Sequence, residues 1–195
     1  MKKGFTLAEV LITLAIIGIV AALTIPSLAN GYQKRVLTTQ LQKAYAELSQ
    51  AGAMVVANEM SEDFRRSKAM REGEFVKNFI KTAGSASFAD TYGAYGSGHE
   101  NFTTSKSDLI DNDDYECGKL KSGASFCVLL GDYGNATGTG WMDINGDKGP
   151  NLIGRDMFGF GYSKDGTIGD YDHYLRSIVR ADWDIDKAKD NSKWR

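Results

Sequence analysis

A long uncharged apolar segment near the amino terminus constrains this chain more than any other feature. Residues 10–33 carry no charge, and VLITLAIIGIVAALTI at residues 10–25 is the most apolar part. A bilayer core of about 30 Å is crossed by roughly 20 apolar residues in a helix. Residues 10–29 meet that length, and Lys2 and Lys3 before them predict a cytoplasmic amino terminus. We therefore expect a membrane-spanning helix with the rest of the chain outside.

Glu9, a carboxylate at the edge of this segment, has to be explained by any interpretation of it. A cleaved secretory signal would end at the small residues Ser27 and Ala29. The apolar run is long for such a signal, however, and Glu9 interrupts its beginning. A plain membrane anchor leaves Glu9 without a partner in hydrocarbon, where a charge is costly.

A third interpretation accounts for the carboxylate. The stretch GFTLAEVLITLAIIGI, residues 4–19, resembles the prepilin segment of type IV pilins and type II secretion pseudopilins. The resemblance implies cleavage by a prepilin peptidase after Gly4 and N-methylation of Phe5. It also assigns Glu9 to filament assembly, and Pro26 falls where many pilins carry a helix-kinking proline.

The resemblance implies a structural subunit of a type IV pilus or a type II secretion filament. Its partners would be identical or sibling pilin subunits, a prepilin peptidase, an inner-membrane assembly platform and membrane lipid. The chain would cross the bacterial inner membrane once with its head outside, and then join a pilus or a periplasmic filament. In the dry filament core, Glu9 of one subunit would pair with the Phe5 amine of its neighbour, because an unpaired buried carboxylate is costly.

Two alternatives stay open. The chain is a minor subunit at a filament tip that binds a secreted substrate, DNA or a surface, or it is a secreted soluble domain released after Ala29. Its net charge of -2 gives no sign of nucleic-acid binding outside a DNA-uptake role. No nucleophile, metalloprotease or nucleotide-binding motif occurs in the sequence, so we expect no enzymatic activity.

Beyond the apolar segment, the spacing of apolar residues predicts that the helix continues. Apolar residues recur every three to four positions from Leu37 to Val56, with polar residues between them. Such a stripe has to pack against something, and a globular head is the expected partner. The predicted organisation is a leader at 1–4, a membrane and filament-core helix at 5–29, an amphipathic helix at 30–60 and a head at 61–195.

The start of the head predicts a second helical region. Six apolar side chains between residues 64 and 80 line it, Ser61 is the expected cap, and Gly73 is expected to break it in two. Residues 85–114, which include His99, are expected to form a loop.

The clearest hairpin is YECGKLKSGASFCVLL, residues 115–130. A three-residue loop at 121–123 places Gly123 where a left-handed backbone is preferred. Cys117 then falls opposite Cys127, which predicts a disulfide with Cα atoms roughly 5–6 Å apart. An exported head would permit that oxidation, and two buried free thiols are the alternative.

Residues 138–168 predict three more strands, which gives an antiparallel sheet of four or five strands. Between them, Asp143, Asn145 and Asp147 place oxygens in a pattern that resembles the start of a calcium loop. Asp156 would replace the glutamate that such loops carry at the twelfth position, and a turn rich in Asx residues is the alternative. The predicted fold class is α+β, with one long helix packed on a small antiparallel sheet.

Overall fold

The computed structural model describes residues 4–80, 115–129, 138–146, 148, 153–169 and 173–188. The predicted loop at 85–114 and the side chain of Asp147 lie outside these residues. The chain divides into two compact units, residues 1–36 and residues 37–195. The α+β class is confirmed, since a long amino-terminal helix precedes a five-stranded antiparallel sheet.

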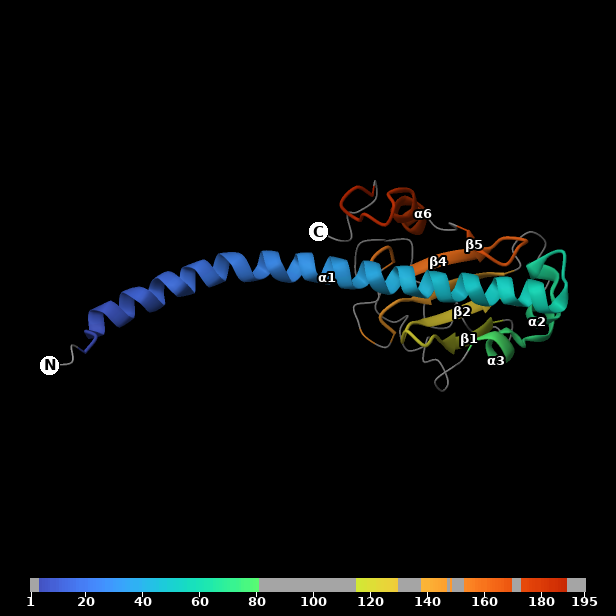
Figure 1. Ribbon diagram of the computed structural model, residues 1–195, viewed down its shortest axis with the longest axis horizontal. Helices are drawn as coiled ribbons and strands as arrows, with labels where there is room; N and C mark the ends of the chain where they lie inside the picture. Colours follow the sequence, from blue (N-terminus) through green and yellow to red (C-terminus); the bar gives the residue numbers. More distant parts are fainter. Residues whose placement is uncertain are drawn as a thin grey trace, which may run out of the picture. The chain divides into compact units, whose positions relative to one another are not determined.

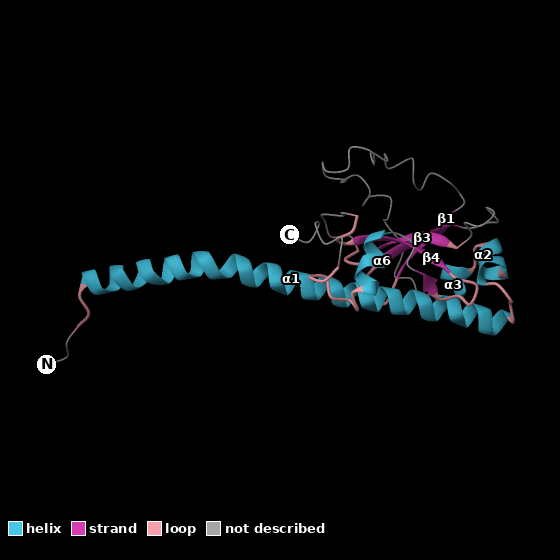
Figure 2. Cartoon of the chain, turned by 90° about the horizontal axis from the view of Figure 1, so that it is seen from above, coloured by secondary structure: helices cyan, strands magenta, loops and turns pink. Residues whose placement is uncertain are grey.

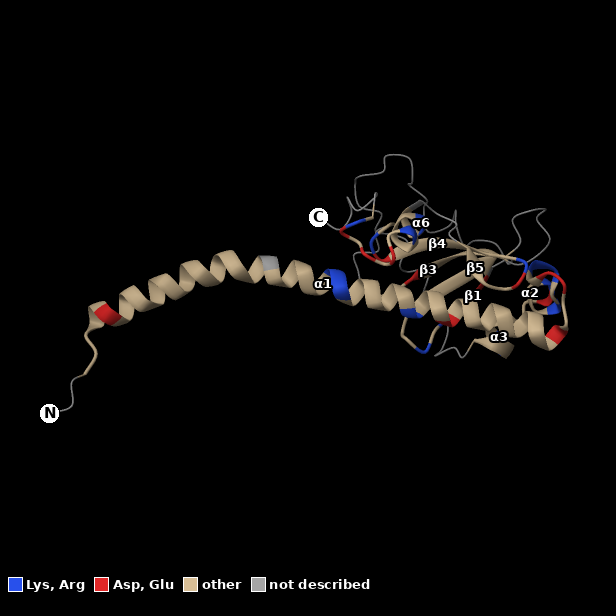
Figure 3. Ribbon diagram, turned by 45° about the horizontal axis from the view of Figure 1, so that its top comes forward, with Lys and Arg blue, Asp and Glu red and all other residues tan. Residues whose placement is uncertain are grey.

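Helix α1 runs from Leu7 to Glu59 and continues through Pro26 (Figure 1). The proline has no N–H to donate to the carbonyl of Ala22, one turn earlier. In the first unit the apolar side chains are exposed, and no residue of the most apolar 18-residue window is buried. Among the described residues, α1 is long and apolar enough to cross a membrane, as judged by length and composition. Glu9 is the acidic residue of the first turn of α1, and Figure 3 shows an acidic position at the beginning of this helix.

In the second unit, one stripe of α1 packs against the sheet, as the apolar spacing predicted. The buried residues of the stripe are Leu41, Ala44, Leu48, Ala51 and Val55. Two views show this part of the helix along one face of the strands (Figures 1 and 2). The Tyr45 hydroxyl donates to the Ile168 carbonyl at 2.7 Å, and the Tyr162 hydroxyl donates to the Leu48 carbonyl at 3.1 Å. These bonds fix the helix on the sheet.

Three short helices follow α1: η1 (Phe64–Arg66), α2 (Lys68–Glu72) and α3 (Phe75–Phe79). Gly73 ends α2 with a left-handed backbone, φ 68°, as expected for a break between two helices. The glutamate at the end of α1 bonds the start of α2, since the Glu59 carboxylate accepts from the N–H groups of Lys68 and Ala69.

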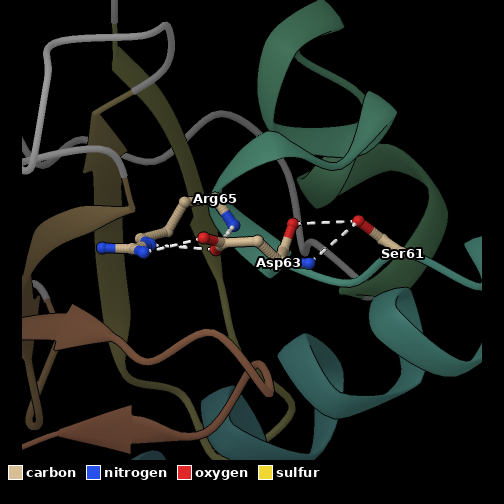
Figure 4. A network of polar contacts seen from close by, with 3 residues as sticks. All are labelled: Ser61, Asp63 and Arg65. Atoms are coloured by element: carbon tan, nitrogen blue, oxygen red, sulfur yellow. Dashed lines mark hydrogen bonds and ion pairs between the residues drawn. The ribbon is translucent and has the colours of Figure 1, made fainter.

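The caps differ from the sequence prediction. Asp63 caps η1 and Ser67 caps α2, whereas Ser61 bonds the backbone of Asp63 (Figure 4). Arg65 donates from Nε and Nη2 to the two carboxylate oxygens of Asp63, at 2.9 and 2.7 Å. That paired geometry lowers the pKa of Asp63. Ser61 is not an N-cap, because the first short helix, η1, begins only at Phe64 and Asp63 directly precedes it.

The sheet is an antiparallel meander in the order β1-β2-β3-β4-β5. Its strands are β1 (Tyr115–Lys119), β2 (Ser125–Leu129), β3 (Thr139–Asp143), β4 (Met157–Tyr162) and β5 (Ile168–Gly169). Helix α6 (His173–Arg180) packs on β4. Aromatic residues fill much of the core, including Phe64, Phe75, Phe126, Phe158 and Phe160.

Candidate assembly site at the start of the long helix

The first turn of α1 is built around Thr6 and Glu9. The Glu9 oxygen Oε2 accepts from the Thr6 backbone N–H and from the Thr6 hydroxyl, both at 2.8 Å. In return, the Glu9 N–H donates to the Thr6 hydroxyl oxygen at 3.3 Å. This reciprocal pattern is a capping box, which satisfies N–H groups that a helix start leaves without intrahelical partners.

The capping box leaves one side of the carboxylate outside the contact with Thr6. All three hydrogen bonds between the two residues use Oε2 or the threonine oxygen, so Oε1 is not engaged by Thr6. Glu9 is exposed, and so are Phe5 and Leu7 on either side of Thr6. The arrangement presents an anionic oxygen at the start of an exposed apolar helix.

Farther along α1 in the first unit, the small residues Gly18 and Ala22 lie on the exposed surface of the helix. A Cβ built on Gly18 would meet no heavy atom within 4 Å, and Ala22 one turn later is exposed. Two small residues four positions apart allow a second helix to approach closely in lipid. The first unit therefore combines a positioned carboxylate with an apolar surface that has no packing partner within the described chain.

Residues 1–25 match the family model described as the prokaryotic N-terminal methylation motif. This segment is a prepilin signature. It is the signature of type IV pilins and pseudopilins, a structural family rather than an enzymatic one. Comparison of the chain with curated proteins and with solved structures found no match.

The prepilin signature includes three of the residues singled out from the sequence. Gly4, Phe5 and Glu9 lie at the start of the motif, and the structure places all three on the exposed surface. Thr6 is the functional candidate that the sequence reasoning missed. The signal was present, because Thr-x-x-Glu directly before an apolar run is the pattern of a capping box.

In the head, the structure joins Cys117 and Cys127 in a disulfide across β1 and β2. The Leu120 N–H donates to the Ala124 carbonyl at 2.8 Å, so Leu120–Ala124 is a hydrogen-bonded pair. Pair types alternate along an antiparallel ladder, which makes Cys117–Cys127 the more closely spaced, non-hydrogen-bonded type. Its Cα atoms are therefore 4.1 Å apart, less than the 5–6 Å expected from the sequence.

The structure also brings together three of the four residues predicted to bind calcium. Asp143 ends β3, Asp156 directly precedes β4, and Asn145 lies in the turn between them. The Asn145 side chain donates to Asp156 at 3.2 Å, and its backbone N–H donates to Asp143 at the same distance. Asp147, the fourth residue of the pattern, lies outside the described residues. No group of three or more His, Cys, Asp or Glu side chains arranged for a metal occurs in the described ranges.

Proposed function

We propose that this chain is a structural subunit of a type IV pilus or a type II secretion filament. In this proposal a prepilin peptidase cleaves after Gly4, the new amino terminus at Phe5 is methylated, and α1 packs into the filament core. The head lies outside the cytoplasm, and sibling subunits and an inner-membrane platform are the partners. The prepilin signature at residues 1–25 is the observation that carries this proposal.

The geometry of the first turn supports a specific role for Glu9. Thr6 holds Oε2, and Oε1 is then available to a group outside the chain. After cleavage Phe5 carries a cationic amine. In the proposed filament, the amine of one subunit binds Glu9 of the next, which neutralises the carboxylate in the dry core and sets the axial register. Losing one partner of a buried ion pair costs about 3–5 kcal/mol, enough to stop assembly.

The experiment combines the mass of the mature amino terminus with filament counts. We expect purified subunits to begin at N-methylated Phe5, and Glu9→Ala and Glu9→Gln to be cleaved and inserted normally but to form few filaments. The amide variant tests charge rather than size, because an amide does not balance a cation. Glu62→Gln is the matched control, since Glu62 is an exposed carboxylate of the head.

Two outcomes would contradict the proposal separately. A mature chain beginning at Asn30 would identify a secreted domain and remove the filament role. Wild-type amounts of filament from both Glu9 variants, with no wild-type subunit present, would remove the pairing and leave the processing intact.

A further inference from the structure

The two cysteines of the head disulfide differ in how accessible they are. Cys127 lies on β2, between β1 and β3, and is 0% exposed. Cys117 lies on β1 and is partly exposed. In the sheet that the described residues form, β1 is an edge strand (Figure 1). A reagent can therefore reach the disulfide from the side of β1 but not from the side of β2.

The disulfide lies on the face of the sheet opposite α3. Glu116 on β1 points toward α3, because its carboxylate accepts a hydrogen bond from the backbone of that helix. Phe126 on β2 points the same way, because its ring contacts an aromatic ring of α3. Successive residues of a strand point to opposite faces. Cys117 follows Glu116 and Cys127 follows Phe126, so both sulfurs project from the face that α3 does not cover.

The backbone of Cys117 is also directed outward. Hydrogen-bonded and non-hydrogen-bonded pairs alternate along the ladder of β1 and β2, and Cys117–Cys127 is a non-hydrogen-bonded pair. The N–H and C=O of Cys117 therefore point away from β2, toward the side of β1 on which no strand of the described residues pairs. An open edge of this kind binds an extended segment of another protein as an added strand.

We propose that Cys117 is the site at which the head exchanges its disulfide with a thiol–disulfide oxidoreductase. This partner carries a reactive thiolate beside a segment of extended backbone. The extended segment pairs with the N–H and C=O of Cys117 at the edge of β1, and the thiolate then lies beside Sγ of Cys117. Cys127 is the second sulfur of the exchange, and the partner does not contact it. The proposal concerns the head alone and does not depend on filament formation.

The exchange takes two steps. The incoming thiolate attacks Sγ of Cys117, the Cys117–Cys127 bond breaks, and its electron pair goes to Sγ of Cys127, which takes up a proton. The oxidoreductase is then joined to Cys117 by a mixed disulfide. Its second thiolate attacks its own sulfur in that bond, and Cys117 leaves as a thiolate that takes up a proton. The dithiol of the oxidoreductase has become a disulfide, and the cystine has become two thiols.

Glutathione is a small thiol probe for the first step. The full-length chain in detergent is treated with reduced glutathione, quenched in acid and mapped by peptide mass. We expect glutathione on Cys117 in excess over Cys127 by roughly tenfold or more, because exchange depends on access to the sulfur that is attacked. The same treatment in urea is the control. The preference should be lost there, because unfolding exposes both sulfurs.

A thioredoxin whose resolving cysteine is replaced by alanine is the probe for the protein partner. It cannot complete the second step, so the mixed disulfide accumulates. Peptide mapping should place this thioredoxin on Cys117 of the wild-type chain.

The matched variants Cys127→Ala and Cys117→Ala give an independent measurement with glutathione disulfide. Cys127→Ala should be modified readily at Cys117, whereas Cys117→Ala should react at Cys127 roughly tenfold or more slowly. Circular dichroism checks that both variants are folded, and the wild-type mapping decides if either is not.

The proposal is wrong if the native wild-type chain carries glutathione equally on both cysteines or mainly on Cys127. The disulfide would then open by unfolding or from the side of β2. It is also wrong if the two folded variants react with glutathione disulfide at the same rate. A chain that takes glutathione on Cys117 but forms no adduct with the thioredoxin variant would overturn the docking at the edge of β1.

Discussion

Three glutamates of this protein accept hydrogen bonds from N–H groups at the starts of helices, each from a different place in the chain. Glu9 caps its own helix through Thr6, and Glu59 caps α2 from the end of α1. Glu116, on β1, accepts a hydrogen bond from the Val76 N–H at 2.9 Å, at the start of α3. Its other oxygen is buried and accepts no hydrogen bond. At the residue scale, a carboxylate far away in the chain thus replaces a local cap for α3, because Glu74 makes no side-chain capping bond there.

Glu116 should make head stability depend on pH. Burial raises the pKa of Glu116 above its ordinary value of 4.5, against the opposing effect of the N–H groups of α3. The folded state therefore holds the proton more tightly than the unfolded state. The stabilisation that results is complete below pH 4.5 and is lost as the pH rises through the folded-state pKa.

We expect Glu116→Gln to reduce this dependence, because its amide carries no charge and its oxygen still accepts from α3. The variant should gain in Tm relative to the wild type as the pH rises from 4 to 7. Thermal unfolding at several pH values measures this, and comparison with the wild type cancels the contribution of Asp63. A difference in Tm that stays constant across the range would contradict the assignment.

At the scale of elements, the contact between α1 and the turn from β4 to β5 is made by backbone. A Cβ built on Gly52 would overlap the carbonyl oxygen of Gly166, and Gly166 has a left-handed backbone with φ 80°. The Ile168 N–H then donates to the Ser49 hydroxyl oxygen at 3.2 Å. The helix lies close to this turn because neither glycine has a side chain.

Gly52→Ala should therefore destabilise the head, although alanine favours helix. A methyl group there meets backbone, which cannot move aside as a flexible side chain can, and overpacking of this kind costs about 1–3 kcal/mol or more. Gly31→Ala is the control within α1, since a Cβ at Gly31 meets nothing within 4 Å. Denaturant unfolding of both variants should show a loss for Gly52→Ala alone. Equal stability of the two would show that the helix and the turn are not in contact.

At the scale of the whole molecule, the two units differ in what covers their apolar surface. The most apolar window of α1 is unburied, whereas the residues of α1 that enter the core begin at Leu41. The first unit thus needs lipid or other subunits, and the second unit carries its own core.

We expect residues 37–195 to fold without the first unit. A chain beginning at residue 49 should not fold, because it lacks Leu41, Ala44 and Leu48, all 0% exposed. Each side chain of this size buried in the core contributes about 1.5–3 kcal/mol, alanine less, so the loss approaches the whole stability of a domain. Circular dichroism and cooperative thermal unfolding of the two fragments measure the difference. If the fragment 37–195 unfolded as broadly as the fragment that begins at residue 49, the second unit would not fold on its own, and this prediction would be wrong.

The sequence alone determined the features that depend on local spacing. The apolar run, the stripe on α1, the strand positions and the Cys117–Cys127 register all follow from periodicity and turn chemistry within a few residues. The capping box of Thr6 was equally local and was available to the same reasoning. The shift of the cap from Ser61 to Asp63 and Ser67 shows the limit, because helix ends respond to packing as well as to capping preference.

The tertiary structure decided every feature that joins distant parts of the chain. Glu116 reaches α3 from 40 residues away, Gly52 meets Gly166, and Ser125 lies opposite Asp143. A sequence pattern gives the side chains that can cap a helix, permit a close approach or bind an ion. Which of them meet depends on strand register and on how α1 packs on the sheet, and both are set by burying the whole core at once.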